Sequence, residues 1–148
     1  MVMIKENKKA PDFNSVDQSG NKIKLSDFIG KWVLLYFYPK DNTPGCTKEA
    51  CALRDTHKEF TKLNAVVLGV SKDSEKSHSG FIEKFGLPFT LISDKEGKII
   101  NEYGADGIMM PKRISFLIDP EGVVRKIYSK VKPETHASEV IKDLKELA

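Results

Sequence analysis

An apolar and aromatic run without any charge constrains the fold of this chain more than any other stretch of its sequence. The run spans residues 32–38, WVLLYFY, and Pro39 ends it. A short run of this kind, closed by a proline, is typical of a strand that is buried on both faces in a sheet covered by helices. The sequence therefore predicts an α/β architecture that is organised around this strand.

A helix start follows the predicted strand within a few residues. Thr43 is a residue type that suits the N-cap, and Pro44 suits the first helical position, so Gly45 would be second and Cys46 third. We expect the Thr43 hydroxyl to accept a backbone N–H of this helix and still to donate to an incoming oxygen. Cys46 would lie among unpaired amides at the positive end of the helix dipole, which favours its thiolate form. The pattern indicates an activated nucleophile.

Patterns of strand and helix alternate along the rest of the chain. The expected elements are a hairpin at 16–25, a helical turn at 26–28, a helix from Pro44 with an apolar seam at Cys46, Ala50, Leu53, His57 and Phe60, a strand at 65–71, a helix at 74–86 capped by Asp73, a strand at 89–92, a weaker helix at 95–103, strands at 113–119 and 123–128, and a helix at 134–147. This order predicts a central mixed sheet flanked by helices, with an N-terminal β-hairpin.

Length and composition narrow the class of protein. With 148 residues, 40% hydrophobic and 30% charged, the chain suits one soluble domain over residues 1–148. Its net charge of +3 is small, and acidic and basic residues are interspersed, which argues against a nucleic-acid partner. No apolar run suits a signal peptide or a membrane span. We therefore expect a cytoplasmic protein whose thiols are kept reduced, with no membrane partner.

The spacing Pro39-x-x-x-Thr43-x-x-Cys46 resembles the active-site signature of the peroxiredoxins. The run FYPKDNTPGCTKEAC is most similar to the bacterioferritin-comigratory, or Q-type, branch, in which a second cysteine follows five residues after the first, as Cys51 does here. The similarity extends from Ala10 to the C-terminal helix. It implies a thioredoxin-like fold and a thiol peroxidase that reduces hydrogen peroxide and organic hydroperoxides.

The same resemblance implies roles for particular residues. Cys46 would attack the peroxide and become a sulfenic acid, Cys51 would resolve it as a disulfide, and thioredoxin or a similar dithiol would restore both thiols. The segment RISFLID matches a second family motif, whose arginine, here Arg113, faces the reactive thiolate. No metal, flavin or haem is required. The remaining candidates, which would shape or support the pocket, are Pro39, Pro44, Gly45 and Glu49. Glu49 would either hold the site together through an arginine or be a solvated glutamate on the helix face.

The spacing of the two cysteines has a geometric consequence of its own. On one helix, five residues give a rise of roughly 7.5 Å and a rotation of about 140°, so that the Cα atoms of Cys46 and Cys51 would lie about 8 to 9 Å apart. A disulfide tolerates no more than about 7 Å between Cα atoms. We therefore expect residues 46–51 to unwind when the protein is oxidised.

Other interpretations of these residues compete with the peroxidase. Free cysteines are common in cores, and a structural zinc site would need more Cys or His ligands than this region offers. His57 would lie about 16 Å along the helix from Cys46, too far to act as its base. His78 and His136 receive no role, and Arg54 and Arg125 are expected to be surface or ion-pair residues.

Two further functions stay open at this point. One is a general thiol–disulfide oxidoreductase, although the chain lacks the Cys-x-x-Cys motif of that class. The other is a non-enzymatic redox sensor that uses the same two cysteines. The segment GADGIMMPK, residues 104–112, is shorter than in many Q-type proteins and should border the active site. We expect a monomer or a weak dimer.

Overall fold

The computed structural model describes residues 4–148, and its elements follow the predicted order. Along the chain they are β1 (Asn14–Val16), β2 (Lys22–Lys24), the 3-10 turn η1 (Leu25–Phe28), β3 (Trp32–Phe37), α1 (Pro44–Asp55), α2 (His57–Lys62), β4 (Ala65–Ser71), α3 (Glu75–Phe85), β5 (Thr90–Ser93), α4 (Lys98–Glu102), β6 (Ile114–Ile118), β7 (Val124–Tyr128) and α5 (His136–Leu147).

The central sheet has five strands in the order β5-β4-β3-β6-β7, so β3 lies in the middle. It pairs with β4 in parallel and with β6 in antiparallel orientation, which makes the sheet mixed as predicted. Every residue of β3 is buried. The uncharged run therefore forms the strand that the sequence predicts, because both of its neighbours and both faces of the sheet exclude water.

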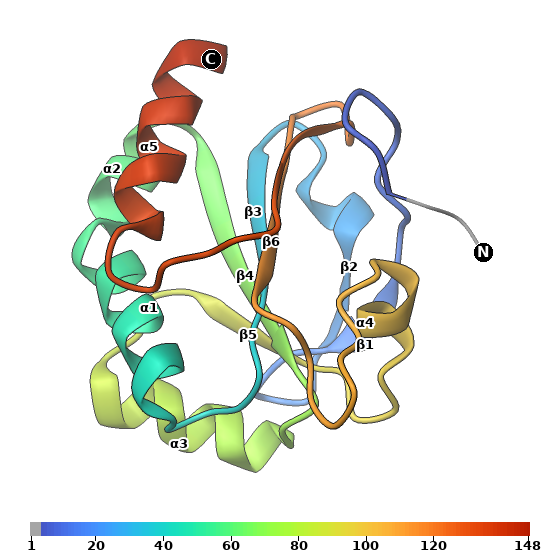
Figure 1. Cartoon of the computed structure of the whole chain (residues 1–148), viewed down its shortest axis with the longest axis vertical. Coiled ribbons are helices and arrows are strands. Elements are labelled where there is room, and N and C mark those ends of the chain that lie inside the picture. The colour runs from blue at the N-terminus through green and yellow to red at the C-terminus, as the bar shows by residue number, and fades with distance from the viewer. Residues whose placement is uncertain (1–3) are drawn as a thin grey trace.

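Two layers cover the sheet (Figure 1). Helices α1, α2, α3 and α5 lie on one face, and the β1–β2 hairpin, η1 and α4 lie on the other. Successive side chains of β3 alternate between the two faces. Leu34 and Tyr36 pack among the four helices, whereas Val33, Leu35 and Phe37 pack toward the hairpin side. This is the thioredoxin-like arrangement with an added N-terminal hairpin.

The helix that starts at Pro44 is shorter than predicted. It ends at Asp55, and α2 begins at His57, because Thr56 leaves the helical backbone at φ −107° and ψ 9°. The Thr56 hydroxyl also donates to the Ala52 carbonyl at 2.8 Å, a local bond that competes with the regular helix. The predicted seam thus continues onto a second, separate helix.

Two other helix boundaries also differ from the prediction. Ser74, not Asp73, caps α3, since its hydroxyl oxygen accepts the Ser77 N–H at 3.1 Å. The Asp73 carboxylate instead accepts the Ser71 hydroxyl at 2.6 Å. The helix predicted from residue 95 begins only after Gly97, whose φ of 73° lies in the left-handed region. Between Ile4 and Ala148, every helix falls short of the length and apolar character that a bilayer crossing requires.

Candidate active site

The start of α1 places Cys46 where the sequence predicts it. Thr43 is the N-cap in extended conformation, Pro44 is the first helical residue, and the Thr47 N–H donates to the Thr43 carbonyl at 2.9 Å. The amides of the first turn have no acceptor within their own helix, so they leave partial positive charge around the third position. Cys46 is 2% exposed, and its sulfur is therefore largely shielded from water.

The Thr43 hydroxyl does not form the predicted cap. It accepts no N–H of α1 and donates to the Lys40 carbonyl at 2.8 Å, within the turn that joins β3 to α1. Because its proton is used in this bond, its oxygen remains as an acceptor. The expected role is therefore reversed: Thr43 can receive a proton donor rather than offer one.

Arg113 lies at the entry to β6, whose first residue, Ile114, pairs with Phe37 at the end of β3. This register brings a side chain from late in the sequence to the start of α1. Arg113 Nη2 lies 3.3 Å from Cys46 Sγ, and Nη1 lies 2.7 Å from Glu49 Oε1. Glu49 is 1% exposed, so it is not a solvated glutamate on a helix face. One guanidinium thus bridges the thiol and a buried carboxylate.

Gly45 is the residue that allows this close approach. A β carbon at Gly45 would lie 2.9 Å from Arg113 Nη2 and 3.8 Å from the Pro133 ring. Such a contact would push the guanidinium away from the sulfur, since its other end is held by Glu49. Pro39 and Pro44 have different surroundings: Pro39 is half-buried two residues after the end of β3, and Pro44 is exposed.

The segment 104–112 lies beside the turn that precedes α1. Met109, Met110 and Pro111 line a cavity of about 220 Å³ together with Pro39 and Lys40. The Lys112 N–H donates to the Ala105 carbonyl at 2.7 Å and closes the base of this segment. The segment therefore borders the candidate site, as the sequence predicts, and exposes Met109 next to it.

Burial and charge act against each other at the Arg113–Glu49 pair. Burial raises the pKa of Glu49 to about 7, although the Arg113 charge and hydrogen bond lower it. Burial alone would lower the pKa of Arg113, but its hydrogen bond to Cys46 and the charges of Cys46 and Glu49 raise the net value. Glu49 Oε2 and the Tyr36 hydroxyl are buried polar atoms for which the described residues supply no hydrogen-bond partner. Glu49 is thus a carboxyl group with a pKa near neutrality, held against the guanidinium that contacts the Cys46 sulfur.

This shift predicts a pH dependence of stability. Because the folded-state pKa of Glu49 is raised, the stabilisation by its proton is complete below the unfolded-state value and is lost as pH rises through about 7. The free energy of unfolding can fall by about 3 kcal/mol, because each pKa unit of the shift corresponds to about 1.4 kcal/mol. Glu49→Gln should lack it, so wild type should lose more unfolding free energy than the variant between about pH 5 and about pH 8. Urea unfolding measures this, and equal slopes for the two proteins would contradict it.

Cys51 lies on the same helix as Cys46, as the geometric argument requires. Both cysteines are free, and Cys51 is half-buried. Since α1 is continuous from Pro44 to Asp55, the two thiols are separated by regular helix. The two sulfurs cannot be joined while this helix is intact.

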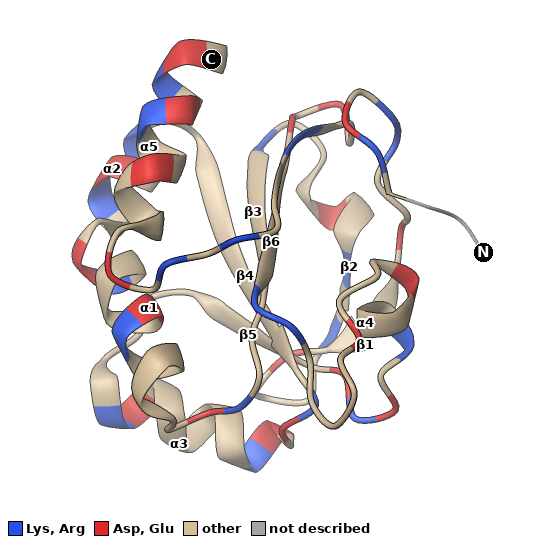
Figure 2. Cartoon of the chain, viewed as in Figure 1, with Lys and Arg blue, Asp and Glu red and all other residues tan. Residues whose placement is uncertain are grey.

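Basic residues lie on three chain segments near the starts of α1 and β6 (Figure 2). Lysine and arginine colour the chain that leads into α1, the chain that enters β6 and the connection from β7 to α5. In the sequence these positions correspond to Lys40, Lys112, Lys130 and Lys132. Basic surroundings favour an anionic sulfur and attract anionic reaction partners.

Two histidines to which the sequence assigned no role are buried in hydrogen-bond networks. His136 Nε2 lies 2.9 Å from the Ser115 hydroxyl. His78 Nδ1 lies 2.8 Å from Asp41 Oδ2, in the turn that leads to Thr43. The sequence does not reveal this pair, because its members are far apart along the chain; the only local signal is Asp41, which stands two residues before Thr43.

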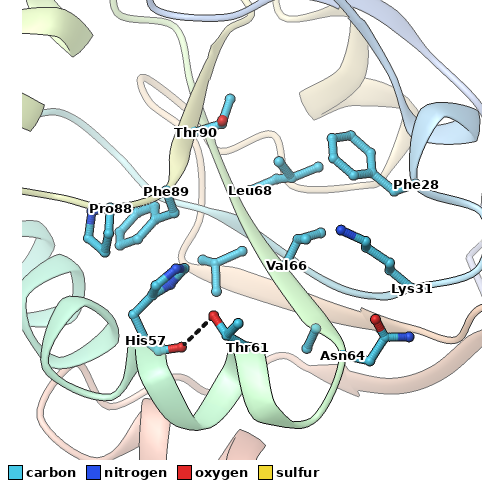
Figure 3. A pocket seen from close by; sticks show the side chains of 12 residues that line it. Phe28, Lys31, His57, Thr61, Asn64, Val66, Leu68, Pro88, Phe89 and Thr90 are labelled. Atoms are coloured by element: carbon cyan, nitrogen blue, oxygen red, sulfur yellow. Dashed lines mark hydrogen bonds between the residues drawn. The ribbon is translucent and has the colours of Figure 1, made fainter.

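A separate cavity of about 280 Å³ lies at the edge of the sheet, between α2 and the starts of β4 and β5 (Figure 3). His57, Thr61 and Phe89 are among the side chains that line it. It contains no residue of the predicted site. His57 is thus placed away from Cys46, as the spacing along the helix indicates.

Comparison with known proteins agrees with this fold and this site. Residues 7–127 match the model of the AhpC/TSA family. A putative peroxiredoxin, Bcp, from Coxiella burnetii is 46% identical over 95% of this chain and 98% of its own, and peroxiredoxin Bcp from Bacillus subtilis is 43% identical over 99% of both.

Solved structures give the same result. The chain of a PrxQ cysteine-to-serine mutant from Xylella fastidiosa superposes with a TM-score of 0.94 and 31% identity over 99% of both chains. Peroxidoxin BcpB from Mycobacterium tuberculosis gives 0.91 and 34% over 98% of this chain and 99% of its own.

A thioredoxin-like sheet with a cysteine at the start of α1 and an arginine on its sulfur defines a thiol-dependent redox protein. The chain belongs to the AhpC/TSA family, and its relatives place it with the Bcp and Q-type peroxiredoxins.

Proposed function

We propose that the protein is a thiol peroxidase that reduces hydrogen peroxide and organic hydroperoxides through Cys46. The observation that carries this proposal is the 3.3 Å contact between Arg113 Nη2 and Cys46 Sγ at the start of α1. A guanidinium keeps its charge at all physiological pH values, so it stabilises a thiolate and can also donate to peroxide oxygens. The relatives named as peroxiredoxins support the same activity.

We expect each group of the site to have one task in the first step. The Cys46 thiolate attacks one oxygen of ROOH, the O–O bond breaks, and a proton is taken up to give Cys46–SOH and ROH. Arg113 donates to the peroxide oxygens and stabilises the charge that moves onto the leaving oxygen. Thr43, whose proton is held by the Lys40 carbonyl, accepts the peroxide O–H. Pro39, Pro44 and Gly45 shape the approach, and Glu49 holds Arg113.

The second step joins the two cysteines. The Cys51 thiol condenses with Cys46–SOH, which forms the S–S bond and releases water. A dithiol protein, which we take to be thioredoxin, then reduces the disulfide by exchange and is itself oxidised. This chemistry suits a reducing compartment such as the cytoplasm, and it needs no metal or organic cofactor.

Oxidation should unwind the first turns of α1. Residues 46–51 lie within a continuous helix, in which the cysteine Cα atoms are too far apart for a disulfide. We expect amide hydrogen exchange within residues 46–51 to be much faster in the oxidised than in the reduced protein, while the strands β3 and β4 stay protected. Mass spectrometry of exchanged peptides measures the difference. Equal protection of the helix in both states would refute the unwinding.

Steady-state peroxide consumption with thioredoxin, thioredoxin reductase and NADPH tests the proposed function. A peroxidase should consume many equivalents of peroxide per protein. A redox sensor would stop after one equivalent, and a general oxidoreductase would reduce insulin disulfides faster than peroxide. Hydrogen peroxide and an alkyl hydroperoxide should be compared, since the Xanthomonas campestris bacterioferritin comigratory protein, 35% identical to this chain with a TM-score of 0.87, is described by its alkyl peroxide reduction activity.

A further inference from the structure

A buried hydrogen-bond network holds the turn between β3 and α1 in place. Asp41, in the middle of this turn, is 4% exposed. Its backbone N–H donates to Asp73 Oδ2 at 2.9 Å, and its Oδ1 accepts the Tyr38 hydroxyl at 2.5 Å. Its Oδ2 accepts the Ser77 hydroxyl at 2.8 Å. Three segments, the end of β3, the loop before α3 and α3 itself, therefore converge on one residue of the turn.

His78 of α3 completes the network and connects it to β5. The side chain is completely buried, with Nδ1 2.8 Å from Asp41 Oδ2 and Nε2 3.0 Å from the Ile92 carbonyl oxygen. Nδ1 also lies 3.4 Å from the hydroxyl of Tyr38, which donates to Asp41 Oδ1. The imidazole is therefore held at one nitrogen by the turn and at the other by β5.

A buried pair of this kind is a poor source of stability but a strong constraint on geometry. Removing two ionisable groups from water costs as much as their attraction returns, and a pair left with one partner is strongly destabilised. One potential ligand atom from each of Asp41, Asp73 and His78 lies within 4.8 Å of the other two, as in a metal site. Each of them already has a protein hydrogen-bond partner, so the cluster is explained without an ion.

The turn that this network anchors contains one residue with a strained backbone, Asn42, and one candidate catalytic residue, Thr43. Asn42 has a φ of 63°, in the left-handed region that non-glycine residues rarely adopt. Such a conformation persists when its surroundings hold it in place. The two residues that flank Asp41 and Asn42 are joined to each other: the Thr43 hydroxyl donates to the Lys40 carbonyl at 2.8 Å, and this bond orients the hydroxyl. The anchor at Asp41 lies between these two residues.

We propose that Asp41 and His78 are positioning residues of the peroxidase site. Their hydrogen bond joins the turn of residues 40–43 to α3 and, through the Ile92 carbonyl, to β5, and thereby holds the Thr43 oxygen where it accepts the O–H of the peroxide. The pair acts through Thr43 and touches neither the sulfur nor the substrate. This inference rests on the proposed function, because it assigns a cause to the placement of one group of that site.

Two substitutions of His78 separate positioning from simple packing. His78→Asn keeps a donor near the Nδ1 position, facing Asp41, whereas His78→Gln keeps a donor near the Nε2 position, facing Ile92. We expect His78→Asn to react with hydrogen peroxide at nearly the wild-type rate and His78→Gln to react at least about tenfold more slowly, since a displacement of about 1 Å in a reacting group can cost about a hundredfold. His57→Gln, in the cavity of Figure 3, is the matched histidine control.

The informative readout compares two reactions of the same thiol. Iodoacetamide alkylates Cys46 without needing the Thr43 oxygen, so its rate in reduced His78→Gln should stay within about twofold of wild type while the peroxide rate falls. Equal losses in both reactions, or no loss of the peroxide rate, would overturn the inference. If wild type itself consumes no peroxide catalytically, the proposed function fails and the inference falls with it. If wild type is active and His78→Gln matches it, the inference alone fails.

A spectroscopic measurement keeps the proposal falsifiable if His78→Gln does not fold. Nitrogen-detected NMR of the wild-type imidazole should show the nitrogen that faces Asp41 in a hydrogen bond with that carboxyl group, whichever partner carries the proton. A ring nitrogen without this hydrogen bond would overturn the inference. Asp41→Asn offers a second route, because its amide can donate to a neutral ring and should preserve the peroxide rate.

Discussion

Cys46→Ser should reduce peroxide consumption to the rate of the uncatalysed reaction. The hydroxyl oxygen of serine is not ionised at neutral pH, and it cannot form the sulfenic acid on which the cycle depends. Serine differs from cysteine by one atom at a site that is 2% exposed, so the fold and the Arg113–Glu49 contact should survive. The measurement is steady-state peroxide loss with a thioredoxin system in excess.

The control for this variant is its thermal unfolding, which should stay close to that of wild type. Peroxide consumption by a folded Cys46→Ser protein would mean that another group reacts, with Cys51 as the obvious candidate. The assignment of Cys46 as the attacking thiol would then be wrong, although the family membership would stand.

Cys51→Ser should preserve the first turnover and stop the cycle. Cys46 keeps its surroundings at the start of α1, so one equivalent of peroxide should be consumed at nearly the wild-type rate. Without a second thiol the sulfenic acid has no partner within the chain, and further peroxide oxidises it to the sulfinic acid. Thioredoxin-supported turnover should fall to background, and mass spectrometry should find two added oxygens on Cys46.

A matched control for this experiment is Cys51→Ser treated with a small external thiol, which can form a mixed disulfide with Cys46 and should restore slow turnover. Full turnover of Cys51→Ser with thioredoxin alone would show that the reductant attacks Cys46 directly. In that case α1 would not need to unwind, and the two cysteines would not act as a pair.

The sequence predicts most of the fold because its strongest patterns are local. The run at residues 32–38 can be buried on both faces only in a central strand, and Thr43-Pro44 can begin a helix before any tertiary contact forms. The break at Thr56 is different. It arises from one hydroxyl bonding back to a carbonyl, and a helical seam does not reveal such competition.

The candidate site also has one part that local sequence patterns predict and another that depends on tertiary contacts. The position of Cys46 follows from local rules, whereas its contact with Arg113 depends on the register between β3 and β6 and is predicted only by the family resemblance. The orientation of Thr43 was predicted wrongly, because its hydroxyl donates to the Lys40 carbonyl and accepts no N–H of the helix. His78 was missed, since the turn it anchors lies 37 residues earlier in the chain.

We expect Arg113 and the first turn of α1 to favour the thiolate form of Cys46. The most direct test of this expectation is the ultraviolet absorbance of the thiolate at neutral pH, measured on the Cys51→Ser background so that only Cys46 contributes. We expect a clear thiolate signal with Arg113 present, a large loss in Arg113→Gln, and a partial loss in Gly45→Ala, where a methyl group displaces the guanidinium. Arg125→Gln, which removes an arginine paired with Asp119, should leave the signal unchanged. An equal thiolate signal in Arg113→Gln and in the parent protein would contradict the account.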